Sequence, residues 1–187
     1  MRLFTGIAIP PVVTSQLEQA VALLRPTAAL RWTPAANLHI TTKFIGAWPD
    51  ERLQELQQAL GAVPVPGNLE ITISRFGYYP NPHTPRIIFA GVRAPALEQL
   101  HRGIEDALEP LGCAREHRPY SPHLTLAKIG REDIRGLRER VASLRECEFG
   151  VFTAAAFHLY QSNTGPEGSV YTRLASWPLV KKEALSC

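Results

Sequence analysis

Two short segments of the sequence carry the same pair of polar side chains. The segments read His39-Ile40-Thr41-Thr42 and His123-Leu124-Thr125-Leu126, and each lies in an apolar run typical of a β-strand. Residues i and i+2 of a strand point to the same face, so each segment presents an imidazole beside a hydroxyl. Imidazoles exchange protons near neutral pH, and hydroxyls donate hydrogen bonds to anions. Two such strands facing across a cleft would suit acid–base chemistry on an anionic phosphodiester.

The segments around these motifs alternate between strand and helix patterns. Strands are predicted over residues 3–9, 30–32, 38–45, 69–76, 86–92, 123–129, 149–160 and 170–177, and helices over 11–25, 50–60, 95–111 and 134–144. The order strand–helix–strand–helix recurs around both motifs, and no linker divides the chain. The sequence therefore predicts an α+β fold in which residues 1–187 form a single domain with two lobes.

Composition narrows the class of protein. The chain has 187 residues, 45% of them hydrophobic and 20% charged, which is typical of a globular domain. The formal net charge of +3 permits a polyanionic ligand without requiring one. The three cysteines, Cys113, Cys147 and Cys187, form no CxxC pair, which argues against a disulfide framework and a structural zinc site. No apolar run has the length of a signal peptide core or a membrane span, so we expect a cytoplasmic protein without membrane contact.

Several segments together resemble a known family, the two-histidine (2H) phosphoesterases, in the branch called RNA 2′,3′-cyclic phosphodiesterases or 2′-5′ RNA ligases. The similar segments are residues 2–4, 31–32, 37–46, 85–92, 122–129 and 159–162, which include both His-x-Thr-x motifs. Thr42 and Lys128 depart mildly from the family pattern. The resemblance implies a bilobal fold of two antiparallel sheets with flanking helices, related by pseudo-twofold symmetry around a central cleft. It also implies that no metal or other cofactor takes part.

The same resemblance implies roles for the motif residues. His39 would be the proton donor to the leaving 3′ oxygen, and His123 would be the proton acceptor that activates water, so the product would be an RNA 2′-phosphomonoester. Thr41 and Thr125 would bind the phosphate, donating hydrogen bonds to its non-bridging oxygens. The two motifs are so alike that the residues alone leave the acid and base roles of the histidines open.

Four further residues are candidates for RNA contacts. Lys43 is expected on the strand face of His39, where it would add positive charge to the cleft. Arg118 and Tyr120 precede the second motif, where a guanidinium and a ring could meet a phosphate or a base. Arg86 could bind phosphate or pair with a carboxylate. An ordinary structural or surface role is the alternative for each of the four, and His83, His101, His117 and His158 are expected to be structural because they lack the Thr at i+2.

Three other functions are consistent with parts of this pattern. The same acid–base pair could run in reverse, joining a 2′,3′-cyclic phosphate end to a 5′-hydroxyl end. A non-catalytic module that binds RNA ends would not need two titratable groups. A histidine-based metal site is disfavoured because neither motif contains Asp, Glu or Cys. We expect a monomer whose partner is an RNA or oligonucleotide with a 2′,3′-cyclic phosphate end; the base and length preference stay open.

Overall fold

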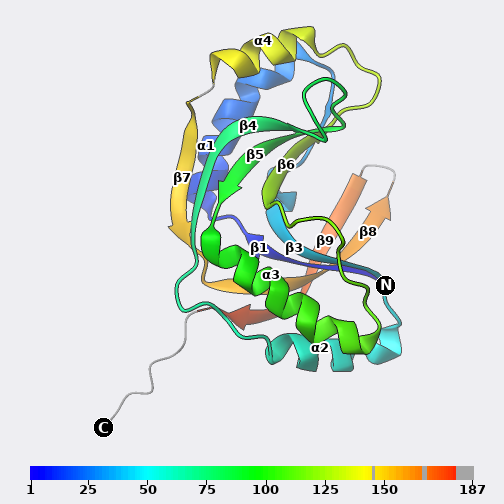
Figure 1. Cartoon of the computed structure of the whole chain (residues 1–187). Coiled ribbons are helices and arrows are strands. Elements are labelled where there is room, and N and C mark those ends of the chain that lie inside the picture. Colours follow the sequence, from blue (N-terminus) through cyan, green and yellow to red (C-terminus); the bar gives the residue numbers. More distant parts are fainter. Residues whose placement is uncertain (145, 166–167, 180–187) are drawn as a thin grey trace.

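The computed structural model describes residues 1–144, 146–165 and 168–179, which form two antiparallel sheets with helices on their outer sides (Figure 1). The first sheet has the strand order β3-β1-β8-β9 and the second has the order β2-β6-β5-β4-β7. The strands of the first sheet are β1 (Arg2–Ala8), β3 (His39–Ala47), β8 (Ala156–Gly165) and β9 (Gly168–Pro178). Those of the second are β2 (Arg31–Trp32), β4 (Glu70–Tyr79), β5 (Ile87–Arg93), β6 (His123–Lys128) and β7 (Glu148–Thr153). This arrangement confirms the predicted α+β class with two antiparallel sheets.

Within the described ranges, four helices cover the two sheets: α1 (Pro11–Leu24), α2 (Leu53–Gly61), α3 (Pro95–Leu108) and α4 (Arg135–Ser143). Short 3-10 turns span Arg25–Thr27, Ala35–Asn37, Asp50–Arg52 and Glu109–Leu111. None of the helices in the described part of the chain is long and apolar enough to cross a membrane.

Two of the helices pack against the sheet to which their preceding strand does not belong. Helix α1 follows β1 of the first sheet but packs against β7 and α4, on the second sheet. Helix α3 follows β5 of the second sheet but packs against β3 and α2, on the first sheet (Figure 1). Each lobe is therefore assembled from both halves of the chain, rather than one lobe from each half.

Local sequence explains why these segments are helices. Pro11 stands at the start of α1, where its fixed φ suits the first turn and its missing N–H costs nothing. Val13, Leu17, Val21 and Leu24 follow at helical spacing, and all four are buried. The stripe that they form packs against the second sheet, which holds α1 in place.

The structure corrects three predicted boundaries. The predicted strand over residues 149–160 is two strands, β7 in the second sheet and β8 in the first, because the chain leaves one sheet for the other at Ala154 and Ala155. The strands predicted to end at residue 160 and to begin at residue 170 extend toward each other as the β8–β9 hairpin, which pairs as far as Gly165 and Gly168. The helix predicted over residues 50–60 begins as a 3-10 turn at Asp50–Arg52, and the Asp50 side chain accepts a 3.0 Å hydrogen bond from the N-terminal ammonium.

Candidate active site

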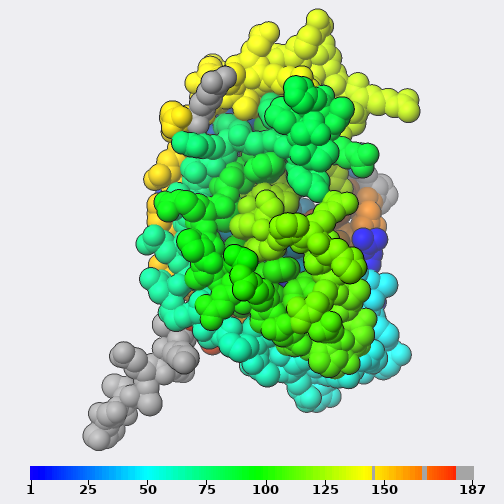
Figure 2. Space-filling model, viewed as in Figure 1, coloured from blue at the N-terminus to red at the C-terminus, as the bar shows by residue number. Residues whose placement is uncertain are grey.

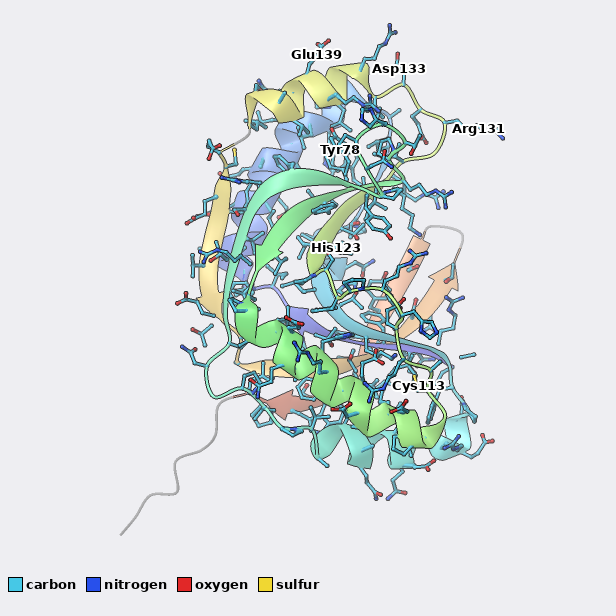
Figure 3. All side chains as sticks on the ribbon, viewed as in Figure 1. Tyr78, Cys113, His123, Arg131, Asp133 and Glu139 are labelled. Carbon is cyan, nitrogen blue, oxygen red and sulfur yellow. The ribbon has the colours of Figure 1, made fainter. Side chains whose placement is uncertain are left out.

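A cleft of about 680 Å³ lies between the two sheets, and both His-x-Thr motifs line it. Strand β3 brings His39 and Thr41 to one side of the cleft, and strand β6 brings His123 and Thr125 to the other. Figure 3 labels His123 at the start of β6, in the middle of the molecule between the two sheets. All four motif side chains are half-buried, so the cleft remains open to a ligand.

Strand β3 contains a β-bulge directly after the first motif. Across the β1–β3 ladder, Gly6 lies opposite Thr41 and Thr5 lies opposite Lys43, which leaves Thr42 as an extra residue. A bulge interrupts the alternation of side chains along a strand. The side chains of Thr42 and Lys43 are consequently both buried behind the sheet, and Phe44 turns back toward the cleft.

Strand β6 repeats this bulge at the equivalent place. Across the β5–β6 ladder, Phe89 lies opposite Thr125 and Ile88 lies opposite Ala127, so Leu126 is the extra residue. Ala127 is buried, and Lys128 turns toward the cleft in the position that Phe44 has in β3. The two motif strands thus share a geometry that accounts for the near-twofold symmetry of the site.

Backbone carbonyls fix the orientation of both imidazoles. His39 Nδ1 lies 2.7 Å from the carbonyl oxygen of Asn37, and His123 Nδ1 lies 2.9 Å from that of Ser121. Because a carbonyl oxygen can only accept, Nδ1 carries the proton in each ring and donates it to the carbonyl. Nε2 of each ring is then left to take up or release a proton in the cleft, which is the arrangement that general acid–base catalysis needs.

His39 lies among aromatic rings that lower its basicity. The ring centroid of Phe4 is 4.6 Å from that of His39, and Tyr171 meets it edge-on at 5.1 Å. Burial lowers the pKa of His39 below 6.5, the hydrogen bond to Asn37 opposes this, and the charge of His123 lowers it further. His39 therefore favours its neutral form, in which Nε2 accepts a hydrogen bond from the Thr41 hydroxyl at 3.1 Å.

Among the residues that the structure describes, His123 contacts a single aromatic ring. The centroid of Phe89 on β5 lies 5.4 Å from that of His123. The Phe89 ring lies over Gly77 of β4, where an added Cβ would overlap it. A glycine is thus required at position 77 for the ring that flanks the second imidazole.

The structure places the four further candidates outside the cleft lining. The prediction that Lys43 shares the strand face of His39 is wrong, because the bulge at Thr42 turns Lys43 behind the sheet. There Lys43 Nζ forms a buried ion pair with Glu105 Oε1 at 2.6 Å.

Of the other three candidates, Arg118 and Tyr120 form hydrogen bonds within the protein, and Arg86 lies elsewhere on the surface. Arg118 is exposed and donates a 2.8 Å hydrogen bond to the hydroxyl of Tyr79. Arg86 lines a separate hollow near α4. The Tyr120 hydroxyl donates to the carbonyl of Thr41 at 2.9 Å, so Tyr120 lies behind the first motif rather than in the cleft.

Sequence reasoning missed several side chains that line the cleft. Phe44 and Lys128 enter it after the two bulges, and Arg2, Arg31 and Tyr171 come from other strands. The side chain of Phe44 is 70% exposed, which is unusual for a large apolar residue and marks it as a candidate ligand contact. The extra residue is Thr in one bulge and Leu in the other, so no residue type in the sequence signals the bulge that turns Phe44 and Lys128 inward.

The sequence is similar to those of proteins in a known family. The model of the LigT-like phosphoesterase family matches residues 7–89 and 91–171. A Methanocaldococcus jannaschii protein named RNA 2′,3′-cyclic phosphodiesterase is 30% identical, over 95% of this chain and 100% of its own. The chain therefore belongs to the LigT-like phosphoesterase family, as its motifs predicted.

Solved structures confirm the fold. A crystal structure of a Thermus thermophilus protein superposes with a TM-score of 0.82 at 28% identity, covering 97% of this chain and 100% of that one. The crystal structure of Escherichia coli LigT complexed with 3′-AMP gives a TM-score of 0.78 at 25% identity, covering 97% and 98%.

Proposed function

We propose that this protein hydrolyses RNA 2′,3′-cyclic phosphodiester ends to 2′-phosphomonoesters by acid–base catalysis with two histidines. One observation carries the proposal: two imidazoles that line the same cleft each have Nδ1 bound to a backbone carbonyl, which leaves both Nε2 atoms for the ligand. Two imidazoles in one cleft can donate a proton to the leaving oxygen and accept a proton from water, and the hydrolysis of a phosphodiester needs both transfers.

The reaction assigns a different task to each imidazole. His123 Nε2 accepts a proton from water as the water oxygen attacks phosphorus. His39 Nε2 gives its proton to O3′ as the bond between phosphorus and O3′ breaks, so the phosphate stays on O2′. His39 must therefore be protonated when the substrate is bound. The negative charge of a bound phosphate favours the imidazolium form and so opposes the low pKa of His39.

The two threonine hydroxyls complete the phosphate site in this proposal. Thr41 and Thr125 lie two residues after the histidines and line the same cleft. They would donate hydrogen bonds to the non-bridging oxygens, on which negative charge accumulates in the transition state. Arg2, Arg31 and Lys128 add positive charge to the cleft and suit a polyanionic substrate.

A metal ion has no role in this mechanism. In the part of the chain that the structure describes, no three His, Cys, Asp or Glu side chains gather in a way that could hold a metal ion. The chemistry of the donor set thus fits proton transfer by imidazoles better than metal coordination.

Similar proteins support the RNA substrate. The relative described above is named for RNA 2′,3′-cyclic phosphodiesterase activity, and it covers nearly the whole of this chain. The E. coli LigT structure was solved with 3′-AMP, a ribonucleotide bearing a phosphate on the ribose ring. We extend this substrate class to the present cleft.

A single incubation tests the proposal. The purified protein is mixed with EDTA and an oligoribonucleotide that ends in a 2′,3′-cyclic phosphate, with and without a second oligonucleotide bearing a 5′-hydroxyl. The expected product is the same oligonucleotide with a 2′-phosphate. A strict need for Mg²⁺ or Zn²⁺ would overturn the mechanism, a 3′-phosphate product would overturn the regiochemistry, and a joined 2′-5′ product would show that ligation competes with hydrolysis.

A further inference from the structure

The bulge after the first motif leaves backbone groups that depend on side chains from elsewhere. An extra residue disrupts the ladder, so its neighbourhood needs other hydrogen-bond partners. The carbonyl of Thr42 accepts a 2.7 Å hydrogen bond from His101 Nδ1 on α3. The carbonyl of Thr41 accepts its 2.9 Å hydrogen bond from the Tyr120 hydroxyl, which comes from the connection between α3 and β6.

These supports form one buried cluster behind the motif. The rings of His101 and Tyr120 stack with centroids 4.1 Å apart and planes 8° from parallel. Lys43 Nζ binds Glu105 Oε1 and also donates to the carbonyl of Ala114, both at 2.6 Å. Lys43, Glu105 and His101 are buried, so the cluster has little freedom to rearrange.

The bulge after the second motif is completed differently. The carbonyl of Leu126 accepts a 2.7 Å hydrogen bond from the backbone N–H of Thr33. The partner of the Leu126 carbonyl is thus a backbone group, whereas the side chains of His101 and Tyr120 donate to the carbonyls at the first bulge. A single side-chain change can therefore remove a hydrogen bond at the first motif.

Tyr120 is also next in sequence to the residue that orients the histidine of the second motif. The next residue, Ser121, provides the carbonyl that holds His123 Nδ1. Figure 3 labels Cys113 and His123 near the two ends of this α3–β6 connection, and Figure 2 shows its yellow-green atoms on the near side of the molecule, between its upper and lower parts. One dipeptide, Tyr120-Ser121, thus touches the backbone of the first motif and the imidazole of the second.

We propose that Tyr120 is a positioning residue for the reaction assigned above, so this inference rests on the proposed function. Its hydroxyl holds the Thr41 carbonyl, and this hydrogen bond sets where the Thr41 hydroxyl lies relative to the two imidazoles. Tyr120 does not touch the substrate. Its effect passes through the backbone of the first motif, and catalysis of this kind is sensitive to misplacement of about 1 Å.

The variant Tyr120→Phe tests this role because it removes only the hydroxyl. We expect kcat to fall about tenfold while KM stays within about twofold, since the substrate contacts remain but the reacting groups are displaced. In a Thr41→Val background, we expect Tyr120→Phe to lower kcat by less than about twofold, because the group that it positions is already gone. Tyr78→Phe is the matched control: it also removes a buried hydroxyl, one without a hydrogen-bond partner in the described structure, and Tyr78 lies outside the cleft lining.

Each outcome decides the matter. Wild-type kcat in Tyr120→Phe would overturn the proposal. An equal loss of kcat in the wild-type and Thr41→Val backgrounds would also overturn it, because such a loss reflects damage to the fold and not the positioning of Thr41. If the wild-type protein turns over no cyclic phosphate, the proposed function fails, and the imidazole ¹⁵N NMR shifts of His39 and His123 test positioning instead. We expect Tyr120→Phe to move those shifts and Tyr78→Phe to leave them; unchanged shifts in both variants would contradict the role of Tyr120.

Discussion

At the scale of single residues, the site consists of two imidazoles in the same tautomer but in different surroundings. His39 is enclosed by Phe4 and Tyr171, whereas His123 meets one aromatic ring of the described residues, that of Phe89. The His-x-Thr pattern predicts which side chains meet in the cleft. It does not predict the tautomer, because the Nδ1 partners are backbone carbonyls, which every sequence has. Nor does it predict the aromatic enclosure of His39, because Tyr171 comes from a strand near the other end of the chain.

Loss of either imidazole is expected to remove most of the activity. His39→Ala and His123→Ala should each lower kcat by ~10²–10⁴-fold, the usual span for a general acid or base. The double variant should lose far less than the product of the two factors, because the pair acts as a unit. Steady-state kinetics on a 2′,3′-cyclic nucleotide measures both effects, with circular dichroism to verify folding. A histidine whose replacement leaves near-normal kcat has no place in the mechanism.

The pH dependence of kcat/KM reports the free enzyme and tests the role given to His39. A proton donor must enter the reaction protonated, so activity is lost as the pH rises through its pKa. Burial lowers the pKa of His39, so little of the free donor is protonated at alkaline pH, and kcat/KM should show an alkaline limb. In the kcat profile the bound phosphate favours the protonated imidazole, so this limb should move to higher pH. His39 is not the donor if the alkaline limb of the wild-type kcat profile lies at lower pH than that of kcat/KM. The same conclusion follows if the kcat/KM profile of His39→Gln still falls at high pH.

At the scale of strands and helices, periodicity predicted most elements but not their irregularities. Alternation along β3 placed Lys43 beside His39, and the bulge at Thr42 reverses that face. The apolar run over residues 149–160 read as one strand because both halves suit a strand, although the chain changes sheets at Ala154. Bulges and changes of sheet depend on the partner strand, which lies far away in the sequence. Local patterns therefore could not reveal them.

The first bulge turns the ring of Phe44 into the cleft, where it could bind a base of the substrate. Its exposed ring lines the cleft and offers a stacking surface for a base, which is worth ~1–3 kcal/mol, or about 5- to 150-fold in affinity. Phe44→Leu should raise KM for adenosine 2′,3′-cyclic monophosphate within that range, and Phe44→Tyr should restore it. A ribose 2′,3′-cyclic phosphate without a base should show no such rise. Val12→Ala, an exposed apolar change on α1, serves as control. Equal effects of Phe44→Leu on both substrates would mean that Phe44 shapes the cleft and does not bind the base.

At the scale of the whole molecule, the exchange of α1 and α3 between the sheets joins the two lobes. An amphipathic stripe such as that of α1 predicts that a face is buried, but not against which sheet. Sequence thus predicted two lobes and missed how they interlock. Each lobe takes part of its core from a helix whose preceding strand belongs to the other lobe. The chain therefore passes between the lobes before and after α1 and α3, which couples the two lobes through these helices.

The interlocked helices predict that the chain unfolds in urea as a single cooperative unit, as expected for one domain. Trp32 lies in the second sheet, and Trp177 lies in the first, stacked on Phe157 at 5.0 Å. Variants that retain only one of these tryptophans, with Phe at the other two tryptophan positions, report on each lobe separately by fluorescence. In each variant, the fluorescence transition should coincide with the loss of far-UV circular dichroism, which reports both lobes together. Fluorescence and circular dichroism midpoints that separate within one variant would show that a lobe keeps its structure alone, which would contradict the coupling of the two lobes through α1 and α3.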